Sequence, residues 1–171
     1  MTIIDGFAPI VSKSAKVLIL GSMPSTASLA KHQYYGHPRN AFWPVMGALV
    51  GAKPELDYQR RQQILIDHHI AVWDVLQSCR RPGSLDSNID MDSIKVNDFI
   101  AFFCEYRNIE RIFFNGGAAE RVFNKQVLPK LNDRFGYLQY QRLPSTSPAH
   151  AGMTLEQKIN AWKAILQPVV K

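Results

Sequence analysis

Short apolar runs alternate along the chain with longer segments in which apolar residues recur at helical spacing. Four runs, at residues 17–20, 70–75, 111–115 and 137–143, are rich in aliphatic and aromatic side chains and have the length of strands. Runs of this kind are typical of strands in a parallel sheet, which is covered on both faces. The pattern therefore predicts four strands separated by helical crossovers.

The segments between and after these runs predict helices. We expect them at residues 40–50, 55–69, 97–106, 118–131 and 154–166. Asn97 is a candidate N-cap, and Thr154 with Gln157 has the spacing of a capping box at the start of the last helix. The residues that follow the second strand, through about Asn88, read as a polar loop.

Strands joined by helical crossovers form a parallel sheet with helices on both faces. We therefore expect an α/β fold, with three αβα layers around a central four-stranded, mostly parallel sheet. The chain has 171 residues and contains no internal repeat, low-complexity tract or linker. One domain over residues 1–171 is the expectation.

Small and polar residues stand where the predicted strands end. They are residues 21–25, Asp74, residues 115–117 and residues 145–152. In an open α/β sheet the carboxyl ends of parallel strands meet at one edge, and ligands bind there. The sequence thus predicts a pocket at this edge, although the convergence alone does not identify its ligand.

The charge balance favours a polyanionic partner. Lys and Arg number 20 against 14 Asp and Glu, and the formal net charge is +6. Basic side chains near phosphates release condensed counterions, which strengthens binding to nucleic acid. Many basic domains bind no nucleic acid, so charge alone does not decide the partner.

Cysteine and histidine usage excludes several kinds of site. Cys79 and Cys104 are the two cysteines and have no CxxC spacing, so we expect no disulfide framework, zinc site or iron–sulfur cluster. The five histidines form no metal-binding motif, and the glycines form no dinucleotide fingerprint, so we expect no metal and no cofactor. No signal peptide or membrane-spanning run is visible, which predicts a cytoplasmic protein without a membrane partner.

Two motifs carry a resemblance to a known family. The first is Gly21-x-x-Pro24-Ser25 with His37-Pro38-x-Asn40-x-Phe42-Trp43, and the second is Ser145-Thr146-Ser147-Pro148-Ala149-His150-Ala151-Gly152. Together they resemble the two motifs of the uracil-DNA glycosylase superfamily, in the same order. The resemblance extends to the mismatch-specific enzymes and, more closely, to the hypoxanthine-DNA (deoxyinosine) glycosylases.

This resemblance implies a catalytic role for Asn40. The mismatch-specific enzymes place the catalytic asparagine or aspartate at the third residue of Gly-x-x-Pro, where this chain has Met23. In the hypoxanthine branch the asparagine of His-Pro-x-Asn takes that role. An amide can orient a water or bind the leaving base. Asparagine is also a good N-cap, so Asn40 has a structural alternative that is compatible with catalysis.

The resemblance also implies a base pocket. Its members would come from the first motif and from the end of the second strand: Gly21, Ser22, Met23, Pro24, Ser25, Tyr35, Trp73 and Asp74. Tyr35 stands where relatives place an aromatic residue that stacks on the flipped base, and it could instead pack beneath the loop. Asp74 could accept a hydrogen bond from a base N–H, or pair with Arg80 or Arg81. Trp73 could line the pocket.

Residues that would hold DNA come mainly from the second motif. They are Ser145, Thr146, Ser147, Pro148, Ala149, His150 and Gly152, with Arg80 and Arg81 as further phosphate contacts. In the superfamily the second motif wedges into the minor groove as a base flips out, and an enzyme acting on a base must extrude it. Without the resemblance, this segment is an ordinary Ser/Pro turn and the arginines are surface charges.

The function that we expect is therefore a monofunctional DNA glycosylase that removes a deaminated base, in the first place hypoxanthine, from double-stranded DNA. We expect it to act as a monomer. A mismatch-specific uracil or thymine glycosylase is an alternative, as is a catalytically silent protein that binds damaged DNA, because Met23 replaces the usual catalytic residue. A nucleotide- or sugar-phosphate-binding α/β enzyme is a further alternative.

Overall fold

A four-stranded parallel sheet in the order β3-β2-β6-β7 forms the centre of the computed structural model, which describes residues 2–168. Its strands are β2 (Val17–Gly21), β3 (Ile70–Asp74), β6 (Arg111–Asn115) and β7 (Gln139–Leu143). β2 and β3 are buried throughout, which explains their continuous apolar sequences. The predicted strands and the parallel sheet are confirmed.

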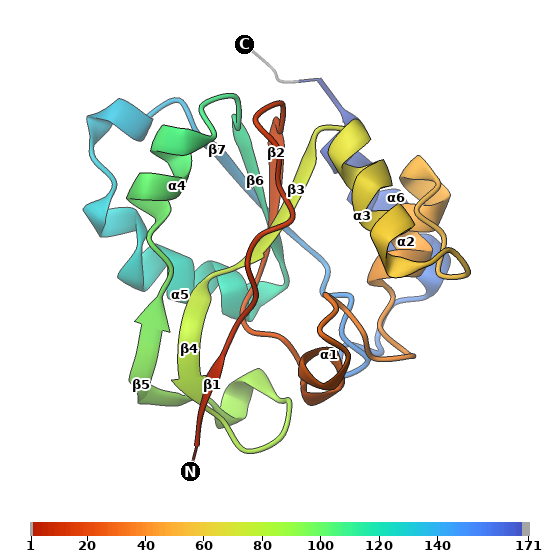
Figure 1. Ribbon diagram of the computed structural model, residues 1–171, viewed down its shortest axis with the longest axis horizontal. Helices are drawn as coiled ribbons and strands as arrows, with labels where there is room; N and C mark the ends of the chain where they lie inside the picture. The colour runs from red at the N-terminus through yellow and green to blue at the C-terminus, as the bar shows by residue number, and fades with distance from the viewer. Residues whose placement is uncertain (1, 169–171) are drawn as a thin grey trace.

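Helices cover both faces of the sheet (Figure 1). α4 (Phe99–Glu105) and α5 (Gly117–Gln126) pack on one face, in a core that includes Leu18, Leu20 and Phe114. α2 (Phe42–Val50), α3 (Tyr58–Asp67) and α6 (Leu155–Trp162) pack on the other face, around Ile19 and Phe113. Successive residues of a strand thus enter opposite cores, and the expected three-layer α/β fold is confirmed.

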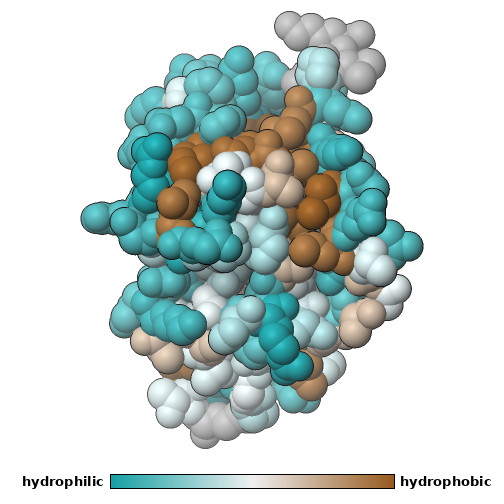
Figure 2. Space-filling view, turned by 90° about the vertical axis from the view of Figure 1, so that its right-hand side faces the viewer, coloured by the Kyte–Doolittle hydropathy of each residue, from teal (hydrophilic) through white to brown (hydrophobic). Residues whose placement is uncertain are grey.

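The layer of α2, α3 and α6 forms the surface that Figure 2 shows. Apolar residues gather in the upper half of this view, and hydrophilic residues border them. Trp162, the last residue of α6, is fully buried and donates a hydrogen bond from Nε1 to the carbonyl oxygen of Pro144 at 2.9 Å. α6 is therefore attached to the segment that follows β7.

A second, antiparallel sheet was not expected. It has the order β1-β4-β5 and consists of β1 (Ile3–Asp5), β4 (Leu76–Arg80) and β5 (Asp90–Val96). The expected polar loop through Asn88 is therefore wrong for residues 76–80. β4 is short, and only Leu76 and Cys79 in it are fully buried, so its sequence lacks the apolar run that marks the central strands.

Several helix ends differ from the predictions. α1 (Thr26–Lys31), capped by the side chain of Ser25, falls in a segment where no helix was expected. α3 begins at Tyr58 after its N-cap Asp57, later than expected. α5 ends at Gln126, and the 3₁₀ turn η2 (Leu128–Lys130) follows, because Pro129 cannot continue a helix.

Asn97 is not the N-cap of α4. Asp98 takes that position and accepts a hydrogen bond from the backbone N–H of Ala101 at 3.1 Å. The Asn97 side chain instead donates to the backbone carbonyl of Asp74 at 2.8 Å. It therefore fixes the chain at the end of β3, beside the predicted pocket.

The capping box of α6 gives a test of local stability. Thr154 accepts from the backbone N–H of Gln157, and the Gln157 side chain accepts from the backbone N–H of Thr154. We predict that Thr154→Ala lowers the free energy of unfolding by about 1 kcal/mol, because a helix N–H loses its partner. Urea unfolding measures this, and Thr154→Ser, which keeps the hydroxyl, should behave as the wild type. Equal stability of all three proteins would contradict it.

Candidate active site

A pocket opens at the carboxyl edge of the parallel sheet, and α1 contributes Ser28 to its lining. Residues from the ends of all four central strands or the segments after them line it: Gly21, Ser22, Met23, Pro24, Ser25, Ser28, Tyr34, Tyr35, Asn40, Asp74, Ser84, Asp86, Asn115, Ser145, Thr146 and Ser147. The expected convergence of strand ends thus exists. Of the expected base-pocket residues, all except Trp73 line this pocket.

The segment after β2 forms one wall and is fixed by hydrogen bonds. The Ser22 hydroxyl donates to Asp86 Oδ1 at 2.6 Å, and the carbonyl oxygen of Pro24 accepts from the Arg81 guanidinium at 2.7 Å. Ser25 caps α1 through the backbone N–H of Ser28. Met23 is buried in the core on the α4/α5 face as well as lining the pocket. This wall therefore has little freedom to move.

Asp74 lies at the base of the pocket and is 4% exposed. It pairs in register with Gly21 on the neighbouring strand. A Cβ atom on Gly21 would lie 2.5 Å from Asp74 Oδ1 and 3.1 Å from the Tyr35 hydroxyl, so only glycine lets these two groups come together there. Asp74 Oδ2 is buried, and no described residue donates a hydrogen bond to it.

Burial gives Asp74 an unusual acidity. Loss of solvation, and next the charge of Asp86, raise its pKa to about 7, while Arg81 acts in the opposite direction. The carboxyl group therefore changes charge near neutral pH. A titratable group of this kind in a pocket is typical of functional sites.

Tyr35 places its ring and its hydroxyl in different surroundings. Its backbone has a positive φ of 56°, and its ring stacks on Phe42 with centroids 4.0 Å apart. The hydroxyl is buried beside Gly21, and no described residue meets hydrogen-bond geometry with it, although Asn115 lies near. Burial, and then the charge of Asp74, raise the pKa of Tyr35, which keeps it a neutral donor.

Asn40 lines the pocket just before α2. Its Oδ1 accepts a hydrogen bond from the backbone N–H of Phe42 at 2.9 Å, so the expected capping contact exists even though the helix begins after Ala41. This is the one hydrogen bond that its side chain makes within residues 2–168. With the oxygen fixed, the Nδ2 group is left to donate to a molecule in the pocket.

Thr146 joins the second motif to the rest of the site. Its Oγ1 accepts from Asn115 Nδ2 and its backbone N–H donates to Asn115 Oδ1, both at 2.9 Å. Its carbonyl oxygen accepts from the backbone N–H of Ala41, also at 2.9 Å. The end of β6, the second motif and the residue after Asn40 are therefore held together by one buried threonine.

Beyond Thr146, the second motif forms an outward loop. Ser147 N–H donates to Ser145 Oγ, and Ala149 N–H donates to Ser147 Oγ. Ala149, His150 and Gly152 are exposed, and Pro148 is half-buried. The ammonium group of Lys158, on α6, donates to the carbonyl oxygen of His150 at 2.9 Å. Within this loop the expected DNA-contacting residues thus face solvent or are partly exposed beside the pocket, except for buried Thr146.

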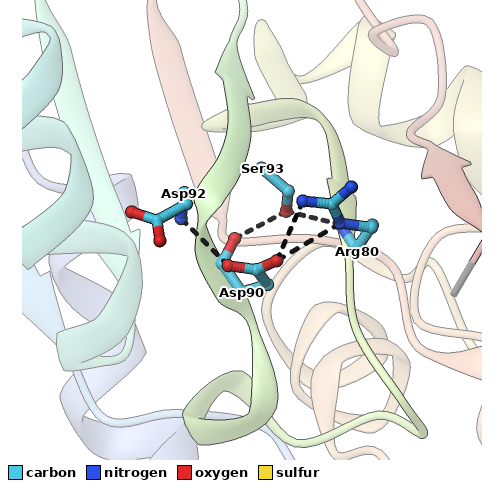
Figure 3. A network of polar contacts seen from close by, with 4 residues as sticks. All are labelled: Arg80, Asp90, Asp92 and Ser93. Carbon is cyan, nitrogen blue, oxygen red and sulfur yellow. Dashed lines mark hydrogen bonds and ion pairs between the residues drawn. The ribbon is translucent and has the colours of Figure 1, made fainter.

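Arg81 does not lie where a phosphate contact must lie. It is 6% exposed, and its guanidinium donates to the carbonyl oxygens of Pro24 and Gly83. A buried guanidinium that is bonded to the backbone is poorly placed to contact a phosphate, so the structure speaks against this expected contact. Arg80 is partly exposed and pairs with Asp90 at 3.1 Å, in the network with Ser93 that Figure 3 shows.

Trp73 faces away from the pocket. Its ring stacks on Phe102, with centroids 4.6 Å apart, and its Nε1 donates to the carbonyl oxygen of Phe7. Neighbouring residues of a strand point to opposite faces of the sheet, so the side chain of Trp73 points away from the face to which Asp74 points. The expectation that Trp73 lines the pocket is wrong, because its ring belongs to the core beneath α4.

Five residues that line the pocket were not among the expected site residues: Ser28, Tyr34, Ser84, Asp86 and Asn115. Asn115 is the last residue of β6, and this position at a strand end was the feature of the sequence that could have placed it in the pocket. Asp86 lies in the 3₁₀ turn η1 (Asp86–Asn88), far from the other wall in sequence, so neither a strand end nor one of the two motifs pointed to it.

Neither a metal centre nor a membrane span is found in the part of the chain that the structure describes. No group of three or more His, Cys, Asp or Glu side chains there is arranged to hold a metal ion. No helix among these residues is long and apolar enough to cross a bilayer.

Comparisons with known proteins point to one family. A family model described as the uracil DNA glycosylase superfamily matches residues 8–167. A Methanosarcina acetivorans protein named hypoxanthine DNA glycosylase is 32% identical over 163 residues, which are 95% of this chain and 97% of the relative. A Methanosarcina barkeri protein of the same name is 38% identical over 113 residues, covering 66% and 70% of the two chains.

A solved structure shares the fold over almost the whole chain. It is a solution NMR structure of a Methanosarcina acetivorans protein named as a candidate uracil DNA glycosylase, with a TM-score of 0.76 and 28% identity. The alignment covers 97% of this chain and all of that one. On the match to the family model, the full-length relative and the pocket at the sheet edge, the chain belongs to the uracil-DNA glycosylase superfamily.

Proposed function

We propose that this protein is a monofunctional DNA glycosylase that acts on deoxyinosine in duplex DNA. It extrudes the nucleotide from the base stack and hydrolyses the bond between hypoxanthine and the sugar, which leaves an abasic site. Two relatives that carry the name hypoxanthine DNA glycosylase support this substrate. The enzyme acts as a single-domain monomer. Its two free cysteines fit a reducing compartment such as the cytoplasm.

The observation that carries the proposal is the placement of the Asn40 amide. Met23 occupies the usual catalytic position and offers no group that can polarise water. Asn40 lines the same pocket with its oxygen bound to the backbone of α2 and its Nδ2 group free of described partners. An amide N–H held in this way is suited to bind an acceptor atom of the base as that base gains negative charge.

The reaction is a hydrolysis at the anomeric carbon. As the bond between C1′ and the base nitrogen breaks, its electron pair goes to the base, and the sugar passes through an oxocarbenium-like state. Water then adds to C1′ and loses a proton, while the base takes up a proton. No lysine lines the pocket in the described chain, which supports hydrolysis without a Schiff-base step.

Asp74 and Tyr35 read the base. An ionised Asp74 accepts from the N1–H of hypoxanthine, a hydrogen that adenine lacks at that position. The Tyr35 ring is already stacked on Phe42 on one side, which leaves its other face for the base. The exposed residues of the loop at 145–152 hold the DNA strand from which the nucleotide is extruded.

The proposal is tested with labelled duplexes that carry a single inosine, uracil, xanthine or mismatched thymine, followed by alkali to break abasic sites. We expect alkali-dependent cleavage at inosine. Cleavage at uracil or mismatched thymine alone would favour the second candidate, a mismatch-specific uracil or thymine glycosylase. The name of the similar solved structure mentions uracil as the base, and not a mismatch. Salt-dependent binding without any cleavage would overturn the proposal in favour of a silent DNA-binding protein.

Asn40→Ala should separate chemistry from binding. We predict that excision of hypoxanthine falls by about 100-fold or more, because transition-state stabilisation is lost, while the Kd for inosine DNA stays within about threefold. Single-turnover cleavage and a binding titration measure the two quantities. A loss of binding equal to the loss of activity would contradict a chemical role for Asn40.

The pH dependence of excision should follow Asp74. The hydrogen bond from base N1–H is strongest to the ionised carboxylate, so we predict that kcat/KM rises through about pH 7 and then levels off. Asp74→Asn should remove this rise. A wild-type profile that is flat through neutrality, or an unchanged rise in the variant, would contradict the assignment.

The same group should make the folded state less stable as pH rises. Because the pKa of Asp74 is raised from 3.8 to about 7 by folding, its stabilising contribution is present below pH 3.8 and is lost as pH rises through about 7. The loss is at most about 4 kcal/mol, since one pKa unit corresponds to about 1.4 kcal/mol. Urea unfolding at several pH values should show a smaller loss for Asp74→Asn than for the wild type.

Arg80 and Arg81 should differ in their effects on DNA binding. We predict that Arg81→Gln lowers the free energy of unfolding by about 1–3 kcal/mol, because the buried carbonyl of Pro24 loses its donor. The salt dependence of its DNA binding should not change. If the partly exposed Arg80 contacts a phosphate, Arg80→Gln reduces the slope of log K against log salt by about 0.9. A reduced slope in Arg81→Gln would contradict the burial argument.

A further inference from the structure

A second hollow adjoins the base pocket and shares its mouth. One side consists of Ser84, Leu85, Asp86 and Ser87, and the other consists of residues from the loop at 145–150. Ser84, Asp86, Ser145 and Ser147 line both this hollow and the base pocket. A nucleotide that enters the pocket therefore passes between these two sides.

Leu85 stands at this mouth with its side chain in solvent. It is 52% exposed, although leucine gains free energy from burial. The side chains of its two neighbours hold this segment in place: Ser84 Oγ accepts from the backbone N–H of Thr26 at 2.9 Å, and Asp86 Oδ1 accepts from the Ser22 hydroxyl at 2.6 Å. The chain thus presents an apolar side chain from a fixed support.

The opposite side of the hollow offers no comparable group. Its residues are Ser145, Ser147, Ala149 and His150, which are small or polar. Extruding a nucleotide leaves a gap between the neighbouring base pairs, and proteins that open a stack commonly fill such a gap with an apolar side chain. An alanine methyl is too short to fill it, and a polar group would lose its water there.

We propose that Leu85 is the wedge that enters the base stack and occupies the space left by the extruded nucleotide. This inference rests on the proposed DNA glycosylase function. The loop at 145–152 then holds the backbone of the opened strand, while Leu85 acts from the facing side of the mouth. Leu85 is a positioning residue, because it stabilises the extruded state and does not touch the reacting bond.

The test compares Leu85→Ala with wild type on inosine in duplex and in single-stranded DNA of the same sequence. Single-stranded DNA has no base-paired stack to fill. We therefore expect excision from the duplex to fall by about tenfold or more, while excision from the single strand stays within about twofold. Leu85→Met should retain most duplex activity, and Leu85→Asn, of similar size but polar, should not.

Met91→Ala is the matched control. Met91 is 49% exposed, lies on the neighbouring β5 and does not line the mouth shared with residues 145–150. It should leave the ratio of duplex to single-strand excision unchanged. Equal losses on both substrates in Leu85→Ala, or no loss on either, would overturn the proposal, since the first indicates a role in the pocket and the second no role.

A fluorescence measurement keeps this inference separate from the proposed function. In duplexes with 2-aminopurine beside inosine, unstacking raises fluorescence when the protein binds, and no cleavage is needed. We expect the rise with wild type and Asn40→Ala, and a much smaller rise with Leu85→Ala. Absence of cleavage by wild type would refute the glycosylase, whereas an equal rise with Leu85→Ala would refute the wedge.

Discussion

The site depends on the hydrogen bonds that Thr146 makes. Its side chain and backbone form a reciprocal pair with Asn115 at the end of β6, and its carbonyl oxygen binds the backbone just after Asn40. Thr146 is 1% exposed, so these bonds are protected from competition with water. Two motifs far apart in sequence are held at a fixed distance by this one residue. Both the position of the candidate catalytic amide and that of the DNA-facing loop follow from it.

Unpartnered buried atoms mark the base of the pocket. Asp74 Oδ2 and the Tyr35 hydroxyl are buried, and neither has a hydrogen-bond partner in the described chain. Leaving such groups unsatisfied costs stability, so folded proteins rarely retain them without a function. Gly21 lets the two groups approach, since any Cβ there would collide with Asp74. The pocket is thus organised for a ligand at the expense of the free protein.

Sequence patterns predicted the central sheet because β2, β3 and β6 are almost continuously apolar, and they predicted α6 because Thr154 and Gln157 have a capping-box spacing. The second sheet could not be predicted, since β5 is half exposed and carries charged residues in its interior. Asn40, Tyr35 and Asp74 were found through motifs and strand ends. The positions of Arg81 and Trp73 depend on tertiary packing, which local sequence does not encode.

The bonds from Ser22 to Asp86 and from Arg81 to Pro24 have a mechanical consequence. They link the segment after β2 to the segment that carries Leu85, so a displacement of one segment is passed to the other. Under the proposed function, a base seated against the wall and a stack filled by Leu85 then favour each other. A nucleotide that fits the wall poorly also weakens the filling of the stack, which couples the choice of base to the opening of the duplex.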